Sequence, residues 1–216
     1  MIAIIDYGMG NLRSVQKAFE QVGAEARIFA APPELPVGGA DQLILPGVGA
    51  FGDGVANLRE RGWIEPIKAH IESGRPFLGI CLGMQLLFDG SEEDAPTEGQ
   101  LVPGLSILPG EVVQFRQPRT GPRIKVPHMG WNTLTWKRDD PLLRGLDQGA
   151  AVYFVHSYFV RPREQPGTPI ASATTDYPEG LAFCSSLWCG NIWATQFHPE
   201  KSQRVGLQML ANFAKL

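Results

Sequence analysis

The sequence is short of cysteine, of excess charge and of long apolar runs. It has three cysteines among 216 residues and a formal net charge of -3. Three cysteines without metal-ligand spacing form no disulfide framework, and the charge provides no overall basic field for nucleic acid or anionic membranes. No apolar run approaches the roughly 20 residues of a membrane span, and no basic region precedes the first apolar stretch. We therefore expect a cytoplasmic protein that binds neither nucleic acid nor membrane.

The order of apolar segments predicts a single α/β domain over residues 1–216. In the first half, short apolar runs alternate with segments of helical period, which indicates parallel βαβ units. The expected strands are 2–6, 26–29, 42–45 and 76–80, and the expected helices are 12–22, 55–63, 65–72 and 82–88. The second half is rich in β-formers, in 107–115, 132–136, 151–160, 170–174, 181–187 and 192–197, before a last helix at 202–216. We expect a central, mostly parallel sheet flanked by helices, with antiparallel additions in the second half.

Cys81 lies between an expected strand and an expected helix, in Gly79-Ile80-Cys81-Leu82-Gly83. This is the form of a nucleophile elbow with cysteine in place of serine. The flanking glycines remove side chains that would clash in so sharp a turn, and the helix start favours the thiolate. The N–H of Leu82 then points at the same space as an oxyanion donor. The alternative is a buried packing cysteine, which is our interpretation of Cys184 and Cys189.

His198 is the candidate base, because it follows the expected strand 192–197 and precedes Glu200 by two residues. In extended backbone the two side chains point to one face, and Pro199 limits the geometry between them. Glu200 can accept from one ring nitrogen and leave the other to face the thiol. His156, inside another expected strand, is the alternative base.

A glycine-rich segment follows the expected strand 42–45, in Pro46-Gly47-Val48-Gly49-Ala50-Phe51-Gly52-Asp53-Gly54. Glycine allows positive φ, so a peptide N–H from Gly47, Val48 or Gly49 can turn inward to stabilise an oxyanion. A phosphate-binding loop is the competing function, but no Lys-Ser or Lys-Thr follows. A simple tight connection is the other interpretation.

Together these motifs resemble the class I (triad) glutamine amidotransferases. Residues 79–85 are similar to the family's nucleophile motif and residues 197–200 to its His-Pro-Glu motif. Within the class, further segments resemble the glutaminase subunits of imidazole glycerol phosphate synthase, namely 5–12, 46–49, 127–132, 153–158 and 195–202. The resemblance extends from residue 2 to the last helix.

The resemblance implies a flavodoxin-like fold that hydrolyses L-glutamine through a glutamyl thioester on Cys81, without metal or cofactor. It implies a heterodimer with a (β/α)8-barrel synthase (cyclase) subunit. That partner would use the ammonia to make imidazole glycerol phosphate and aminoimidazole carboxamide ribotide in histidine biosynthesis. The implied substrate contacts are Gly49, Gly52, Gln85, His156, Ser157 and Tyr158. The implied partner contacts are Asn11, Trp131 and Lys201.

The residues alone leave other functions open. A glutaminase subunit of another pathway, such as anthranilate or pyridoxal phosphate synthesis, and a stand-alone cysteine-dependent hydrolase are the alternatives. A glutaminase fills a domain of this size, and free ammonia is mostly protonated at neutral pH, so its product must pass to a docked partner. A basic cluster can belong to the docking rim or to a solvated loop; it consists of Arg116, Arg119, Arg123 and Lys125.

Overall fold

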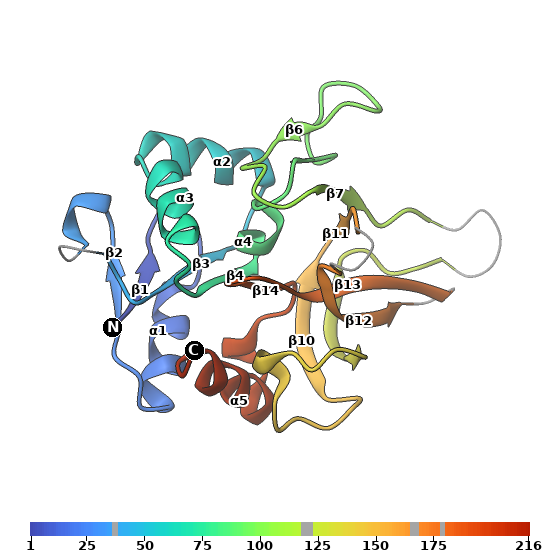
Figure 1. Ribbon diagram of the computed structural model, residues 1–216. Coiled ribbons are helices and arrows are strands. Elements are labelled where there is room, and N and C mark those ends of the chain that lie inside the picture. Colours follow the sequence, from blue (N-terminus) through green and yellow to red (C-terminus); the bar gives the residue numbers. More distant parts are fainter. Residues whose placement is uncertain (36–38, 118–122, 165–168, 178–179) are drawn as a thin grey trace.

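The computed structural model describes residues 1–35, 39–117, 123–164, 169–177 and 180–216 (Figure 1). The helices are α1 (Leu12–Gln21), α2 (Phe51–Glu60), α3 (Ile64–Glu72), α4 (Leu82–Gln85) and α5 (Gln203–Phe213). The strands of the main sheet are β1 (Ile2–Ile5), β2 (Ala26–Phe29), β3 (Gln42–Gly47), β4 (Phe77–Cys81), β9 (Thr135–Trp136), β12 (Ala171–Tyr177), β13 (Leu181–Cys189) and β14 (Ile192–Thr195).

The main sheet has eight strands in the order β2-β1-β3-β4-β14-β13-β12-β9. Neighbours from β2 to β14 are parallel, whereas β13, β12 and β9 are added antiparallel. The predicted parallel centre with antiparallel additions is therefore confirmed. The last two strands of the main sheet along the chain form a hairpin, in which Cys189 pairs with Ile192 around a turn where Gly190 has φ +59°.

Helices cover both faces of the main sheet because its strand residues alternate between two cores. Ile2 and Ile4 of β1 belong to a core with residues of α1 and α5. Ala3 and Ile5 belong to a second core with residues of α2, α3 and α4. Figure 1 shows the two groups of helices on opposite sides of the sheet. This alternation follows from the two-residue period of a strand, and it leaves the strand ends as the place where polar groups gather.

The expected strand 151–160 is in fact two strands that belong to different sheets. β10 (Ala151–His156) pairs with β8 (His128–Thr133), and β11 (Tyr158–Pro162) pairs with β7 (Gly110–Gln114). Ser157 is the single residue between them, and its carbonyl accepts from Phe115 N at 3.1 Å. The polypeptide leaves one sheet and enters the other at this point. The backbone of residues 156–158 therefore departs from regular strand geometry.

The helix expected at 55–63 begins earlier, at Phe51, so Gly52 and Gly54 lie inside α2. Glycine is usually unfavourable in a helix, but a Cβ on Gly54 would lie 3.2 Å from Leu82 and Leu86 side chains. The close packing of α2 on Leu82 and Leu86 therefore favours glycine there. The α-helix expected at 82–88, in contrast, is shorter than predicted and ends at Gln85.

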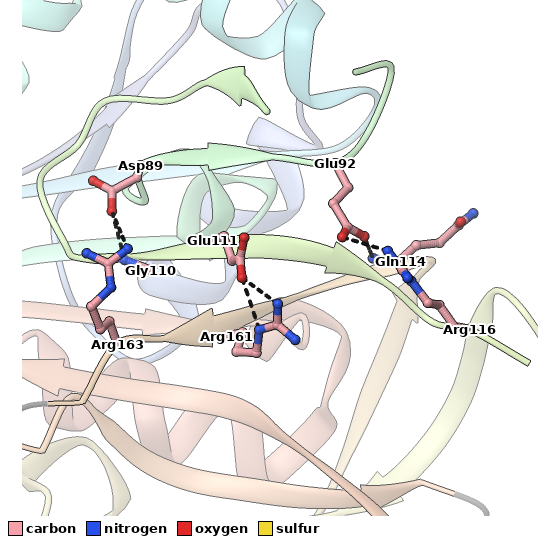
Figure 2. A network of polar contacts seen from close by, with 8 residues as sticks. All are labelled: Asp89, Glu92, Gly110, Glu111, Gln114, Arg116, Arg161 and Arg163. Carbon is pink, nitrogen blue, oxygen red and sulfur yellow. Dashed lines mark hydrogen bonds and ion pairs between the residues drawn. The ribbon is translucent and has the colours of Figure 1, made fainter. Parts of the chain in front are cut away.

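A row of ion pairs joins β7 and β11 to β5 (Gly90–Ser91) and its flanks, in a sheet that also includes β6 (Val102–Pro103) (Figure 2). The pairs are Asp89 with Arg163 at 3.8 Å, Glu92 with Arg116 at 2.9 Å, and Glu111 with Arg161. Exposed pairs contribute little each, but Glu92 also accepts from Gln114 N at 3.1 Å. This bond fixes the segment that carries Glu93. Of the basic cluster, Arg116 is thus paired, and Arg119 lies outside the described residues.

Candidate active site

Three strand ends meet at Cys81. Register places Gly47 of β3 opposite Cys81 of β4, and Thr195 of β14 opposite Ile80 on the other side. Gln196 therefore follows directly beside the sulfur, and His198 lies two residues further on. The carboxyl ends of parallel strands are the usual place for a site in an open α/β sheet.

The backbone at Cys81 is strained, with φ +55° and ψ -108°. A non-glycine residue at positive φ is uncommon and costs energy. The neighbouring glycines are required by space: a Cβ on Gly79 would lie 2.7 Å from Gly83 O, and one on Gly83 would lie 1.7 Å from Leu45 O. The turn expected from the sequence is present, and it leaves the cysteine 6% exposed at the head of α4.

His198 Nδ1 lies 2.8 Å from Glu200 Oε1, and both side chains are 2% exposed. The sequence argument for this contact assumed extended backbone, but Pro199–Lys201 form a 3-10 turn that brings the carboxylate back to the ring. The other nitrogen, Nε2, is buried without a standard hydrogen bond in the described part of the chain. Burial alone would lower the pKa of His198, but the neighbouring Cys81 and Glu200 outweigh it and raise the pKa.

A cavity of about 330 Å³ opens beside the sulfur, within the size range of small-molecule sites. Besides Cys81, its lining includes most of the expected oxyanion and substrate residues, namely Val48, Gly49, Leu82, Gln85, His156, Ser157 and Tyr158. The expected oxyanion residue Gly47 is not part of it. Gly52 is not part of this lining, because it lies in the first turn of α2. The sequence interpretation missed Glu93, Pro127 and Val155, which also line it.

The histidine considered as an alternative base is engaged at both ring nitrogens. His156 Nδ1 lies 2.8 Å from Tyr158 O, and its Nε2 lies 3.0 Å from His128 Nδ1. Burial lowers the pKa of His156 to about 3. A ring so hard to protonate, with no free nitrogen, is unsuited to the general-base role, so the geometry favours His198.

Two polar side chains without a distinctive sequence signal complete the site. Glu93 Oε2 accepts from Phe51 N at 2.8 Å, and burial raises the pKa of Glu93. Gln196, fully buried, has its Nε2 3.7 Å from Cys81 Sγ. Neither was predicted, because their positions depend on strand register and on a loop after β5. The adjacency of Gln196 to the His-Pro-Glu motif is the only available hint.

Within the expected oxyanion loop Gly47 is buried, but Val48 and Gly49 are exposed, in contrast to the buried Cys81 and His198. Val48 is 40% exposed, and Gly49 has φ +112°. The expected partner contacts Asn11, Trp131 and Lys201 are all exposed, and Trp131 is 49% exposed although it is a large apolar side chain. Cys184 is buried and Cys189 partly buried, as packing residues would be.

Among the described residues, no three histidine, cysteine or acidic side chains are grouped as metal ligands would be. The same residues include no helix with the length and apolarity to cross a membrane.

A family model described as "Glutamine amidotransferase class-I" matches residues 3–216. The chain is 54% identical over 218 residues to the imidazole glycerol phosphate synthase subunit HisH of Syntrophotalea carbinolica, with 100% of each chain covered. It is 52% identical to the protein of that name from Geobacter metallireducens, covering 99% and 97% of the two chains. Its fold resembles a crystal structure titled glutamine amidotransferase, with a TM-score of 0.70 at 20% identity over 100% of both chains. It also resembles PurLQS from Thermotoga maritima, with a TM-score of 0.70 at 18% identity over 99% and 97% of the chains.

Proposed function

The chain belongs to the class I glutamine amidotransferases and, within them, to the HisH subunits of imidazole glycerol phosphate synthase, and on this premise we propose that Cys81, His198 and Glu200 are its catalytic residues. The observation that carries the proposal is their meeting at one sheet edge, with the strained Cys81 lining a cavity and the His198–Glu200 pair buried behind it. This membership favours histidine biosynthesis over anthranilate or pyridoxal phosphate synthesis, and over a stand-alone hydrolase.

The reaction begins when the Cys81 thiolate attacks the carboxamide carbon of glutamine. The thiol proton has passed to His198 Nε2, which is free because Glu200 holds Nδ1. The C–N bond then breaks as His198 returns that proton to the departing nitrogen, so ammonia leaves and a glutamyl thioester remains. Water attacks the thioester with His198 as base, which releases glutamate and restores the thiol. None of these steps requires a metal or cofactor.

The oxyanion of each tetrahedral intermediate is stabilised by backbone N–H groups on two sides of Cys81. Leu82 supplies one at the head of α4, as in other nucleophile elbows. A peptide N–H of Gly47, Val48 or Gly49 supplies the second, and the positive φ of Gly49 gives this loop the freedom to turn a peptide inward.

Polar groups around the cavity match the two ends of free glutamine. The Glu93 carboxylate gives the lining a negative group for the α-ammonium, and Gln85 presents an amide oxygen that has no hydrogen bond in the described residues. The irregular backbone at His156, Ser157 and Tyr158 offers N–H groups for the α-carboxylate. Gly49 adds backbone without a side chain; Gly52, inside α2, plays no direct part in this arrangement.

The ammonia passes to a (β/α)8-barrel synthase subunit, bound as a heterodimer over the mouth of the cavity. Three large apolar side chains support this: Val48 at the cavity, and Met129 and Trp131 on β8, are 40%, 51% and 49% exposed. Exposed apolar side chains gathered near a site mark interaction surfaces. Asn11 and Lys201 extend this surface. Residues 1–216 act as one domain in this complex, in the cytoplasm.

The test is glutamate release from glutamine by the chain alone, and with the barrel subunit and its ribonucleotide substrate. We expect turnover that rises when the loaded partner is present and ammonia that appears in imidazole glycerol phosphate. No glutamate under either condition would overturn the glutaminase assignment. Turnover that the partner leaves unchanged would overturn the expected influence of the partner on the site, and co-elution of the two subunits tests the heterodimer itself.

A further inference from the structure

A chain of hydrogen bonds starts at Asn132 on β8, where the amide orientation is fixed from two sides. Its Oδ1 accepts from Thr133 N at 2.8 Å, and its Nδ2 donates to Asp176 O at 3.1 Å. The same Nδ2 lies 3.3 Å from His128 Nε2. Because an amide nitrogen can only donate, His128 Nε2 must be the unprotonated acceptor.

The donor-to-acceptor order fixed at Asn132 determines the position of the proton on both buried imidazoles, His128 and His156. The His128 proton is on Nδ1, which lies 3.0 Å from His156 Nε2, so that nitrogen accepts. The His156 proton is then on Nδ1, 2.8 Å from Tyr158 O, and a carbonyl oxygen can only accept. Both rings are therefore neutral, and each has one defined tautomer.

The Tyr158 carbonyl joins this chain to the nucleophile through two glutamines. It also accepts from Gln85 Nε2 at 3.0 Å, and that nitrogen lies 3.0 Å from Gln196 Oε1. Gln196 Oε1 is thus an acceptor, which leaves Nε2 directed at Cys81 Sγ, 3.7 Å away. Turning this amide around would set two NH2 groups against each other and an oxygen against the sulfur, so the orientation is fixed.

We propose that Gln196 is a further catalytic residue, whose Nε2–H donates to the Cys81 sulfur and stabilises its thiolate before attack. Asn132, His128, His156 and Gln85 are positioning residues that hold the donor toward the sulfur. The proposal rests on the proposed glutaminase function. A donor to an anion is stronger than one between neutral groups, and Gln196 is fully buried, so water does not compete with it.

The first test compares Gln196→Met, which keeps the length and loses the donor, with the wild-type protein. The rate of Cys81 alkylation by iodoacetamide is followed against pH by mass spectrometry of the Cys81 peptide, without glutamine. Below the wild-type midpoint we expect about 10-fold slower alkylation in the variant. The ionisable groups near the sulfur among the described residues are unchanged by the substitution: His198 and its partner Glu200, Tyr7, which interacts electrostatically with Cys81, and Glu93, which lines the same cavity. Gln42→Met is the matched control, since Gln42 is also buried and donates to Phe213 O far from the site.

Equal alkylation profiles for Gln196→Met and wild type would overturn the role of Gln196. Glutamine hydrolysis by the wild type in the complex is measured alongside, and its absence would reject the proposed glutaminase function. Slow alkylation of Gln196→Met, with Gln42→Met like the wild type, would support the role of Gln196 whatever the result of that assay. If Gln196→Met does not fold, Gln196→Glu replaces it, because a carboxylate keeps the size of the side chain and sets an acceptor against the sulfur; an unchanged alkylation profile would again overturn the role of Gln196. The nitrogen-15 chemical shifts of the wild-type histidines test the positioning residues separately. We expect the Nδ1–H tautomer at His128 and His156, and an Nε2–H tautomer at either would overturn the positioning role of Asn132, His128 and His156.

The positioning role has its own spectroscopic test in Asn132→Asp. A carboxylate accepts where the amide donated, so His128 would move its proton to Nε2 and His156 would follow. We expect both nitrogen-15 patterns to switch and Cys81 alkylation below the midpoint to slow by about 3- to 10-fold. If the tautomers switch but Cys81 is alkylated at the wild-type rate, the hydrogen bonds of Asn132, His128 and His156 do not act on the sulfur.

Discussion

The two sides of the Cys81 sulfur are built differently. On the β14 side, Gln196 and His198 are buried and hydrogen-bonded, and the His198 backbone is held by Tyr153 O and Ser202 Oγ at 3.0 and 2.6 Å. On the β3 side, Val48 is 40% exposed and Gly49 relies on a positive φ. The side of the proposed base is therefore preorganised, whereas the side of the proposed oxyanion loop is left adjustable. This difference indicates where a bound partner can influence the reaction: through the loop after β3 and not through the base.

The largest effect on activity is expected from removing the Cys81 thiol, which lies between the two sides. Cys81→Ala should lower glutamine hydrolysis by at least about 10⁵-fold, because no other group on the cavity can form the thioester. The melting temperature should stay the same or rise, since the strained position does not depend on the sulfur. Steady-state assays of the complex and thermal unfolding measure the two quantities; measurable turnover would contradict the assignment.

Glu200→Gln tests the preorganised side, because it replaces the carboxylate that contacts His198 Nδ1. An amide can present its NH2 to Nδ1, which favours the wrong tautomer of His198, so kcat should fall on the order of 10³-fold. KM should change little because Glu200 does not line the cavity. Glu20→Gln, on the exposed face of α1, is the control and should behave as wild type. A loss in KM alone would mean that Glu200 binds substrate instead.

The adjustable side is tested by Gly49→Ala. The new Cβ would meet only the mobile end of Met9, at 2.6 Å, so the backbone at φ +112° is the main obstacle. We expect kcat to fall about 10²- to 10³-fold, as for loss of an oxyanion donor. Gly23→Ala is matched, because Gly23 has φ +81° in open space. Both should lose about 1 kcal/mol of stability, and equal activities would remove the loop from catalysis.

The smallest effect concerns the neutral histidines behind the site, and it appears as a pH dependence of stability. The folded pKa of His156 is about 3 against an ordinary 6.5, so between these values the unfolded chain binds a proton that the folded chain does not. Stability is then lost as pH falls below about 6.5, by up to about 1.4 kcal/mol per pH unit. Urea unfolding of wild type and His156→Gln between pH 4 and 7 should give a flatter curve for the variant.

The main sheet, the turn at Cys81 and the contact between His198 and Glu200 could be predicted because their signals are local. Glycines on both sides of Cys81 predict the turn, and one short motif contains both His198 and Glu200. The start of α2 was misplaced because Gly54 suits close packing on Leu82, a contact absent from local sequence.

The polar groups around the triad could not be predicted, because they depend on pairing between distant segments. Gln196 reaches the sulfur only through the register of β14 on β4. His128 and His156 meet because β8 pairs with β10, 28 residues apart. Glu93 depends on the segment that the ion pairs of Figure 2 hold in place.

The positive φ of Cys81 has a consequence for evolution and design. Only glycine adopts that conformation freely, so folding alone would select glycine at this turn, and the cysteine persists at a thermodynamic disadvantage. Replacement of Cys81 by glycine would thus raise the stability of the fold and give a protein that still binds glutamine but no longer hydrolyses it. Efforts to make this protein more heat-resistant should seek their gains far from the elbow, where catalysis and robustness do not compete.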